Sequence, residues 1–305
     1  MTSATAPTTR ASSGTDVGVG RRRFSLLNPR FAPFVLLTPF MAIFLLFRIW
    51  PLFVATRMSF QDVQGLQATD WVGFENYQKI FDNPSFGTAM VNTFVYTILT
   101  LIILIPLPLA LSALLDRGRT YRPMAWRMAL FIPALASLVV VSVIFRVVLA
   151  EDGLLNSALM TIGLPPQGWL TTASLAIPSL LLVATWRWVG INMLYFNSGL
   201  VNISRELYEA AAIDGARGWQ MFWHITVPLM RPTIIFVLII SVIGGFQLFV
   251  EPFLLWAGGN SPSQGGLSMA LLIYRTAFTN FKFGEAAAMG VVLALVILIV
   301  SLIVF

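Results

Sequence analysis

Long apolar segments alternate with shorter polar segments along the chain, and this pattern predicts membrane-spanning helices. Each apolar segment is close to the ~20 residues that a helix needs to cross a bilayer. Prolines inside the segments are compatible with spanning helices, because neighbouring helices can satisfy the backbone groups that a proline leaves free. The pattern predicts an all-α polytopic membrane protein with six spans, at residues 31–53, 91–115, 128–149, 173–196, 233–255 and 285–305.

The composition and the charge distribution agree with this interpretation. Hydrophobic residues make up 57% of the chain and charged residues 10%, whereas a soluble domain carries about 25% charged residues. Cysteine is absent, so the chain has no disulfides and no thiolate chemistry. Most of the 19 Lys and Arg residues lie before the first span or in the loops after the second and fourth spans. By the positive-inside rule we expect these regions and both termini to be cytoplasmic, and we expect no nucleic-acid partner.

The first 30 residues differ from the rest of the chain. Residues 1–20 are mainly Thr, Ser, Ala and Gly, and arginines follow at positions 21–23 and 30. Such a segment cannot bury enough apolar surface to fold alone. A signal peptide is not indicated, because the apolar run begins only near Phe31 and lacks a small-residue cleavage site. We therefore predict a disordered basic cytoplasmic tail over residues 1–30 and a transmembrane domain over residues 31–305.

The polar interval between the fourth and fifth spans has the pattern of a helix, a turn and a second helix. Ser204 is a suitable N-cap for the first helix. Gly215 permits a sharp turn that a side chain would resist. The second helix is predicted over residues 217–225 and must end near Pro228. A loop with this design suits a docking element for another protein better than a simple connection.

The residue spacing in this interval resembles the signature loop of permease subunits of binding-protein-dependent ABC importers. Glu-Ala-Ala is followed after three residues by Gly, and after nine more by Ile-x-x-Pro. The longer string from Glu206 to Ala216 resembles the carbohydrate branch of that family, which includes maltose, trehalose and glycerol-phosphate uptake systems. Val227, where the family usually has Leu, and Ser204, where it often has Pro, are mild departures. Shorter similarities extend the resemblance over about residues 30–305.

The resemblance implies a type I importer permease fold in which residues 204–232 form a cytoplasmic coupling loop. The first helix of the loop would then insert into a cleft of a separate ATPase subunit. Glu209 would present a negative charge to the ATPase surface, and Ala210 and Ala211 would leave one helix face narrow enough for close approach. Asp214 would cap the second helix or pair with Arg217. The residues assigned to ATPase coupling are Glu209, Ala210, Ala211, Asp214, Gly215, Ile225 and Pro228.

The same resemblance implies the partners and the location. We expect a second homologous permease subunit, an ATPase dimer, an extracytoplasmic solute-binding protein, membrane lipid and a sugar solute, in a bacterial cytoplasmic membrane that the chain crosses several times. The outside segment from Trp71 to Tyr77 also resembles the family. Aromatic residues populate membrane interfaces in any case, so a partner contact and an interfacial belt both remain open there.

The chain lacks the motifs of an ATP-hydrolysing or metal-dependent enzyme. Its only lysines, Lys79 and Lys282, do not end a glycine-rich phosphate loop. Its single histidine, His224, has no second ligand residue at zinc-binding spacing. We therefore predict no enzymatic activity and no cofactor or metal on this chain, with ATP and Mg bound by the partner ATPase subunits.

Polar residues inside the fourth and fifth spans are candidates for the solute path. An arginine at the centre of a span costs at least ~2.5 kcal/mol, so Arg187 should face protein or water. It either lines the path or forms a structural ion pair, for example with Glu251. Small and polar residues also join membrane helices, so a purely structural role stays open for each candidate. The candidates are Arg187, Asn192, Tyr195, Ser241, Gly244, Gly245, Gln247 and Glu251, with Asn197 also considered.

The sequence thus predicts the permease subunit of an ATP-driven sugar importer. The tail and overall similarity point, within the carbohydrate branch, to the trehalose-uptake permeases of actinobacteria, and a disaccharide such as trehalose is the expected solute. A stand-alone secondary transporter is one alternative, although it would need a proton or sodium relay and the spans hold few acids, Glu251 and Glu285. A membrane scaffold protein is the other. Co-purification of an ATPase and ATP-dependent uptake would separate the three.

Overall fold

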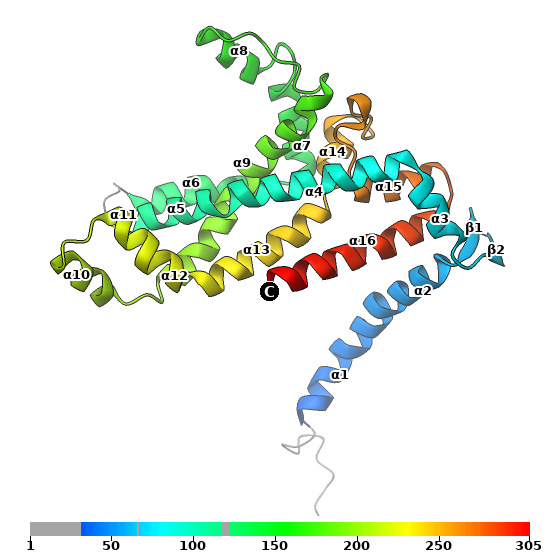
Figure 1. Ribbon diagram of the computed structural model, residues 1–305, viewed down its shortest axis with the longest axis horizontal. Coiled ribbons are helices and arrows are strands. Elements are labelled where there is room, and N and C mark those ends of the chain that lie inside the picture. Colours follow the sequence, from blue (N-terminus) through cyan, green and yellow to red (C-terminus); the bar gives the residue numbers. More distant parts are fainter. Residues whose placement is uncertain (1–31, 66, 117–121) are drawn as a thin grey trace, which may run out of the picture. The chain divides into compact units, whose positions relative to one another are not determined.

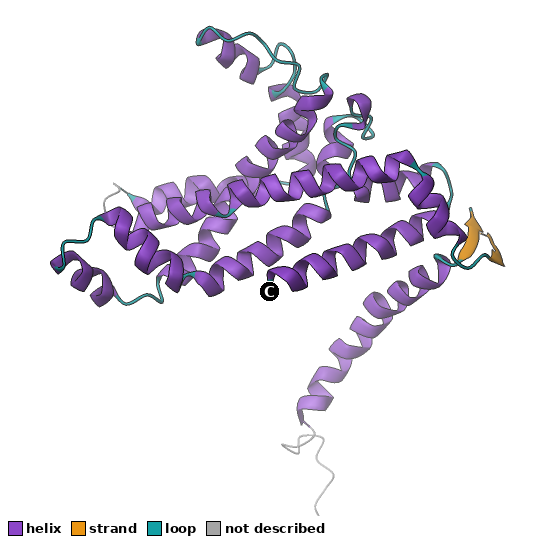
Figure 2. Ribbon diagram, in the orientation of Figure 1, coloured by secondary structure: helices purple, strands orange, loops and turns teal. Residues whose placement is uncertain are grey.

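The computed structural model describes residues 32–65, 67–116 and 122–305, and helices dominate the described chain (Figures 1 and 2). The chain divides into two units, residues 1–53 and 54–305. The predicted tail over residues 1–30 lies outside the described residues. In the first unit the described chain forms α1 (Ala32–Phe44) and a π-helical turn, η1 (Leu45–Ile49).

The first predicted span does not break at its prolines. Pro39 lies inside α1, and the helical run continues through η1 into α2 (Trp50–Met58), beyond the predicted end at residue 53. Pro51 lacks an N–H and crowds the carbonyl four residues before it. The wider π turn just before Pro51 accommodates this defect, so the helix continues to Met58.

The segment between the first two spans contains a small sheet, which the all-α prediction missed. Strands β1 (Gln61–Gln64) and β2 (Gln67–Trp71) pair antiparallel, and α3 (Glu75–Asp82) follows. Asn76 of α3 is buried and donates hydrogen bonds to the carbonyls of Ser59 and Gln61, each at 2.9 Å. These bonds fix the hairpin to α3, and the rings of the predicted aromatic segment pack around Phe60.

The described residues contain between four and six candidate spans, in agreement with the six predicted. Four helical stretches are long and apolar enough to cross a membrane by themselves: Pro33–Met58, Pro84–Leu115, Ala173–Leu200 and Phe283–Val304. Two further candidates are bent helix pairs, Met124–Leu135 with Leu138–Val148 and Gly218–Leu229 with Arg231–Phe246. The stretches after the first correspond to α4 (Pro84–Leu104) with α5 (Pro106–Asp116), to the 3-10 turn η2 (Ala173–Leu175) with α9 (Ala176–Leu200), and to α16 (Phe283–Val304).

The third predicted span is a bent pair and not one continuous helix. It consists of α6 (Pro123–Leu135) and α7 (Leu138–Val148), and the two axes differ by 99°. The N–H of Ala136 donates to the carbonyl of Pro133 in a tight turn, and Ala136 and Ser137 then have extended backbones. Two extended residues end the helical hydrogen-bond ladder, which explains the change of direction.

The fifth predicted span is also interrupted. Helix α13 (Arg231–Phe246) ends one residue after two consecutive glycines, and three residues separate it from α14 (Val250–Leu255). Glycine is a weak helix former. The Leu248 carbonyl in the break accepts a hydrogen bond from the Ser268 hydroxyl, so a side chain from another segment satisfies a backbone group that the helix has released. The break places a non-helical backbone inside the predicted span.

Short helical elements also lie in the predicted outside loops. Asn156 of α8 is fully buried and accepts hydrogen bonds from the Gln167 N–H at 2.9 Å and the Trp169 indole at 3.0 Å, which closes the loop between the third and fourth spans. The elements of these loops are α8 (Leu154–Thr161), the 3-10 turn η4 (Pro262–Gln264), α15 (Met269–Tyr274) and the π-helical η5 (Arg275–Thr279).

Helix α9 lies at the centre of the second unit, where it packs against α4, α5, α6 and α13. Gly190 of α9 meets the backbone of α6 so closely that a Cβ there would lie 1.9 Å from the Leu130 carbonyl oxygen. The buried core falls into three clusters, which contain Phe246, Leu180 and Phe196 respectively. Apolar side chains on α4 and α16 remain exposed, as expected for helices in contact with lipid.

Candidate functional site

The predicted coupling loop begins with a short helix, α10 (Arg205–Ile213). The Ser204 hydroxyl caps it as predicted, because it accepts a hydrogen bond from the Glu206 N–H at 3.3 Å. The helix ends at Asp214, and Gly215 follows with a φ of +81°. Residues other than glycine are strained at this φ, because their Cβ crowds the backbone. The predicted turn at Gly215 is therefore confirmed.

The second helix of the loop is longer than predicted. It comprises α11 (Gly218–Met221), the π-helical η3 (Phe222–Thr226) and α12 (Val227–Leu229), so it extends beyond the predicted range of 217–225 but ends next to Pro228, as predicted. As in the first span, a wider π turn precedes the proline and accommodates its missing N–H. The helix therefore passes through Pro228 and ends at Leu229.

Most of the predicted coupling residues lie at the surface. Asp214 does not play either of its predicted roles in the described part of the chain, since it forms no ion pair with Arg217 and the cap of the second helix comes from Gln220. The Gln220 side-chain oxygen accepts the hydrogen bond from the Arg217 N–H at 2.7 Å. Glu209, Ala210, Asp214, Gly215 and Pro228 are exposed, while Ala211 and Ile225 are partly buried.

A hydrogen bond that the sequence did not reveal joins the two helices of the loop. The hydroxyls of Tyr208 on α10 and Thr226 on η3 lie 2.9 Å apart, and Thr226 is buried. The exposed face of α10 also carries apolar side chains, Leu207 and Ile213, of which Ile213 is 88% exposed. Exposed apolar side chains beside charges are typical of a surface that contacts another protein. The Tyr208–Thr226 contact would make α10 move together with the helix that leads into α13.

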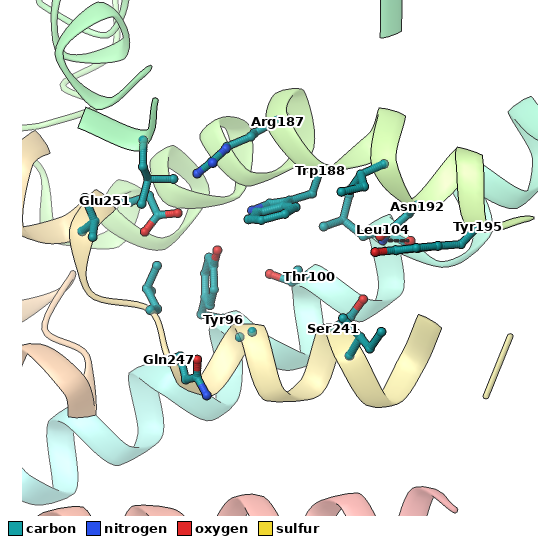
Figure 3. A pocket seen from close by; sticks show the side chains of 17 residues that line it. Tyr96, Thr100, Leu104, Arg187, Trp188, Asn192, Tyr195, Ser241, Gln247 and Glu251 are labelled. Atoms are coloured by element: carbon teal, nitrogen blue, oxygen red, sulfur yellow. Dashed lines mark hydrogen bonds between the residues drawn. The ribbon is translucent and has the colours of Figure 1, made fainter. Parts of the chain in front are cut away.

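A second candidate site is a pocket of about 310 Å³ between α4, α9, α13 and α14 (Figure 3). Helix α9 contributes one wall, α4 a second, and the break between α13 and α14 a third. All the candidates assigned to the solute path from the sequence line it: Arg187, Asn192, Tyr195, Ser241, Gly244, Gly245, Gln247 and Glu251. The fold therefore brings residues from two distant segments of the chain to one place.

Two opposite charges lie at one end of the pocket. Figure 3 shows the Arg187 and Glu251 side chains directed toward each other. They attract each other across the pocket, but within the described chain Arg187 forms no direct ion pair. The Arg187 guanidinium lies 4.7 Å from the centre of the Trp188 ring, and Glu251 is only 7% exposed. The pocket thus contains one positive and one negative charge, each partly removed from water.

The uncharged polar groups divide between structural roles and the pocket. Asn192 donates to the Leu104 carbonyl at 3.0 Å, so one of its hydrogen bonds joins α9 to α4. Asn197 does not line the pocket, and its oxygen instead accepts a hydrogen bond from Ser112 at 2.6 Å. The sequence reasoning missed Tyr96 and Thr100, which line the pocket from α4. Their spacing of four residues within an apolar span places them on one helix face and could have indicated them.

Two buried polar atoms at the pocket have no hydrogen-bond partner among the described residues. They are the Nε of Arg187 and the hydroxyl oxygen of Thr100. Buried polar groups are normally hydrogen-bonded, so such atoms call for an explanation. Both atoms are almost fully buried, so a solute would reach them only after the surrounding side chains move. No group of three or more His, Cys, Asp or Glu side chains in the described ranges could hold a metal ion.

Comparison with known proteins relates the chain to transport systems. Residues 105–305 match the family described as binding-protein-dependent transport system inner membrane component. The arabinooligosaccharides transport system permease protein AraP of Bacillus subtilis is 43% identical over 274 residues, which cover 89% of this chain and 87% of that protein. The lactose transport system permease protein LacF of Rhizobium radiobacter is 32% identical over 270 residues, which cover 88% of this chain and 90% of that protein.

Solved structures of transporter chains share the fold of this chain. A chain of a bacterial ABC transporter involved in the import of the acidic polysaccharide alginate superposes with a TM-score of 0.80 at 25% identity, covering 91% of this chain and 95% of that one. A second structure of an alginate transporter, with a TM-score of 0.80 and 24% identity, contains an alginate pentasaccharide-bound periplasmic protein. The chain is therefore a multi-pass membrane protein that belongs to the family of inner membrane components of binding-protein-dependent transport systems, as the spacing around Gly215 predicted.

Proposed function

We propose that this chain is the permease subunit of an ATP-driven importer and that a neutral oligosaccharide passes through the pocket between α4, α9 and the α13–α14 break. The observation that carries the proposal is the convergence of polar, aromatic and opposite charged side chains on one pocket in a chain of this family. AraP, at 43% identity, is named for arabinooligosaccharides. We therefore favour these sugars over trehalose.

The chemistry of the pocket suits an uncharged sugar. Trp188, Tyr96 and Tyr195 offer aromatic surfaces, which pack well against the apolar faces of sugar rings. Thr100, Ser241 and Gln247 supply hydroxyl and amide groups for hydrogen bonds with sugar hydroxyls. Because Arg187 and Glu251 balance each other, the pocket has no net charge with which to attract an acidic or a basic solute.

The coupling loop gives a physical route from ATP hydrolysis to the pocket. ATP and Mg would bind to a separate ATPase dimer, with α10 seated against it through Glu209 and its exposed apolar residues. The Tyr208–Thr226 hydrogen bond links α10 to the second helix, which continues into α13, and α13 lines the pocket. Closure of the ATPase dimer would then shift α13 as a rigid body and change access to the pocket. A second permease and an extracytoplasmic solute-binding protein would complete the importer.

Uptake by the reconstituted importer tests this function. The chain, its permease partner, the ATPase subunits and the solute-binding protein are placed in proteoliposomes, and uptake of labelled arabinooligosaccharide, trehalose and a uronic-acid oligosaccharide is measured. We expect uptake of the neutral sugars to require hydrolysable ATP, and uptake of the uronic-acid sugar to be absent. Uptake driven by a proton or sodium gradient without ATP would instead identify a secondary transporter.

The turn at Gly215 offers a second test, directed at coupling. A valine at a φ of +81° is strained by roughly 1–3 kcal/mol, yet no described atom lies within 4 Å of its Cβ, so no clash is added. The strain should shift α10 while the spans stay folded. We expect Gly215→Val to keep its folded yield and to lose most ATP-driven uptake, with both measured on the same preparation.

Gly163 provides a matched control for this substitution. It has a φ of +79°, no described atom within 4 Å of its Cβ, and a position in the predicted outside loop. Gly163→Val therefore introduces the same backbone strain away from the ATPase. Asparagine tolerates positive φ, so Gly215→Asn should recover part of the uptake. Equal uptake losses in the two valine variants would remove the coupling role from Gly215.

A further inference from the structure

The second helix of the coupling loop lies steeply inclined to the span that follows it. The helical stretch Gly218–Leu229 and α13 meet at an angle of 70°. If α13 crosses the bilayer, a helix at this angle to it lies close to the membrane plane. In Figure 1 this stretch, labelled α11 and α12, leads into the start of α13, and α10 lies farther out. The geometry places residues 218–229 where the bilayer meets water.

One face of this helix is buried and the neighbouring face carries exposed tryptophans. Phe222 packs on the core cluster, and Thr226 and Met230, at successive intervals of four, are buried. Trp219 is 70% exposed and Trp223 is 48% exposed, and their ring centres are 5.5 Å apart. Tryptophan is enriched where membrane meets water, because its ring is apolar and its N–H is polar. Two adjacent exposed tryptophans are thus better placed in lipid headgroups than in water.

The second helix and α10 differ in the sign of the charges they carry. No acidic residue occurs between Asp214 and Glu251, and exposed arginines, Arg217 and Arg231, flank the helix. Helix α10 and its end carry Glu206, Glu209 and Asp214 against the single Arg205. An anionic lipid surface attracts exposed arginines and repels carboxylates. The charges therefore match the second helix to lipid and α10 to a protein partner.

We propose that residues 218–229 form an interfacial helix that binds anionic lipid headgroups, with Trp219 and Trp223 inserted among them and Arg217 and Arg231 beside phosphate groups. The lipid surface would then support the second helix from one side while the core holds it from the other. Only α10 would be free to contact the ATPase. This inference concerns lipid binding by the coupling loop and does not depend on which solute the importer carries.

The absence of native cysteine makes the proposal directly testable. Single cysteines replace Trp219, Trp223 and, as a control on α10, Ile213, and each is labelled with bimane. The complete importer is reconstituted in nanodiscs of phosphatidylcholine and phosphatidylglycerol that contain a lipid with a nitroxide near its headgroup. We expect the bimane at positions 219 and 223 to lose fluorescence to the lipid nitroxide, and the bimane at position 213 to be unaffected by it.

A further label keeps the test independent of the tryptophans themselves. Because replacing a tryptophan could release the helix, His224→Cys, which is exposed on the same helix, reports its depth with both tryptophans intact. In that background Arg217→Gln should weaken the association of the helix with the anionic lipid surface by about fivefold, measured as lower quenching of the bimane at position 224 by the lipid nitroxide in discs that contain phosphatidylglycerol. Discs of phosphatidylcholine alone should show no such difference.

Two results would overturn the proposal. Labels at positions 219, 223 and 224 that are insensitive to the lipid nitroxide but become shielded when ATPase subunits are added would show that this face contacts protein. Labels that an aqueous quencher such as iodide reaches as readily as it reaches a free bimane-cysteine conjugate in solution would show that the helix lies in water. Either result leaves the uptake test of the proposed function unaffected.

Discussion

Gly190→Ala is expected to destabilise the second unit strongly. The added Cβ would lie 1.9 Å from the Leu130 carbonyl oxygen and 2.8 Å from the Phe131 Cα, both in the backbone of α6. A backbone cannot rotate away as a side chain can, so α6 and α9 would have to separate. Overpacking of this kind costs about 1–3 kcal/mol and occasionally more. We expect a large loss of monodisperse protein in size-exclusion chromatography and a lower midpoint of thermal unfolding.

The same substitution on α16 provides the control. Gly290 also lies inside a helix, but no described atom is within 4 Å of a Cβ at that position. Gly290→Ala should therefore be neutral or stabilise the protein by up to about 1 kcal/mol, because alanine favours helix over glycine. Equal stability of the two alanine variants would contradict the close approach of α6 and α9.

Loss of solute transport should accompany the loss of stability at Gly190. Arg187, Trp188, Ile191 and Asn192, which line the pocket, lie within three residues of Gly190 on α9. A displacement of α9 would move all of them relative to α4 and α13. The fraction of Gly190→Ala that does fold should therefore show reduced ATP-driven uptake per folded importer.

Removal of both pocket charges is expected to be less harmful than removal of either one. In Glu251→Gln the Arg187 guanidinium loses the carboxylate that attracts it, and in Arg187→Met the nearly buried Glu251 loses its counter-charge. An uncompensated charge away from water is destabilising, whereas an apolar or neutral replacement of both partners is often tolerated. We expect a coupling free energy of roughly 0.5–3 kcal/mol between the two sites, measured by thermal unfolding of the two single variants and the double variant.

The effect on transport distinguishes a structural pair from a solute contact. Arg187→Lys keeps the charge but loses the planar guanidinium. If Arg187 binds the solute, this variant should keep its folded yield and show a weaker apparent solute affinity, and the double variant should fold but transport poorly. Strictly additive stability effects together with normal uptake in all variants would exclude any role for the charges of the pair.

The helices and the helix–turn–helix between the fourth and fifth spans were predictable because their causes are local. A run of about 20 apolar residues must span a membrane as a helix, whatever surrounds it. The Ser204 cap and the turn at Gly215 likewise depend on the backbone within a few residues. The sequence predicted both, and the structure confirms them.

The bends were not predictable, since a proline or glycine only weakens a helix and its neighbours decide the result. Pro51 and Pro228 lie in helices that continue through π turns, whereas the third and fifth predicted spans break. In the fifth span the Ser268 hydroxyl, from a segment about 20 residues away, satisfies the released Leu248 carbonyl. No pattern within the span itself contains that information.

The sequence by itself determined that this chain is a helical membrane protein, which family it belongs to, where the helix–turn–helix between the fourth and fifth spans lies and which polar residues are costly to place in a membrane. Only the tertiary structure decided that those polar residues meet in one pocket, because this depends on how α4, α9 and α13 pack. It also decided that Asn197 lies outside the pocket and that Tyr96 and Thr100 line it. Hydropathy and spacing indicate where each residue lies along the chain and how costly it is to place in a membrane. Which residues share a cavity depends instead on contacts between helices, such as the close approach at Gly190.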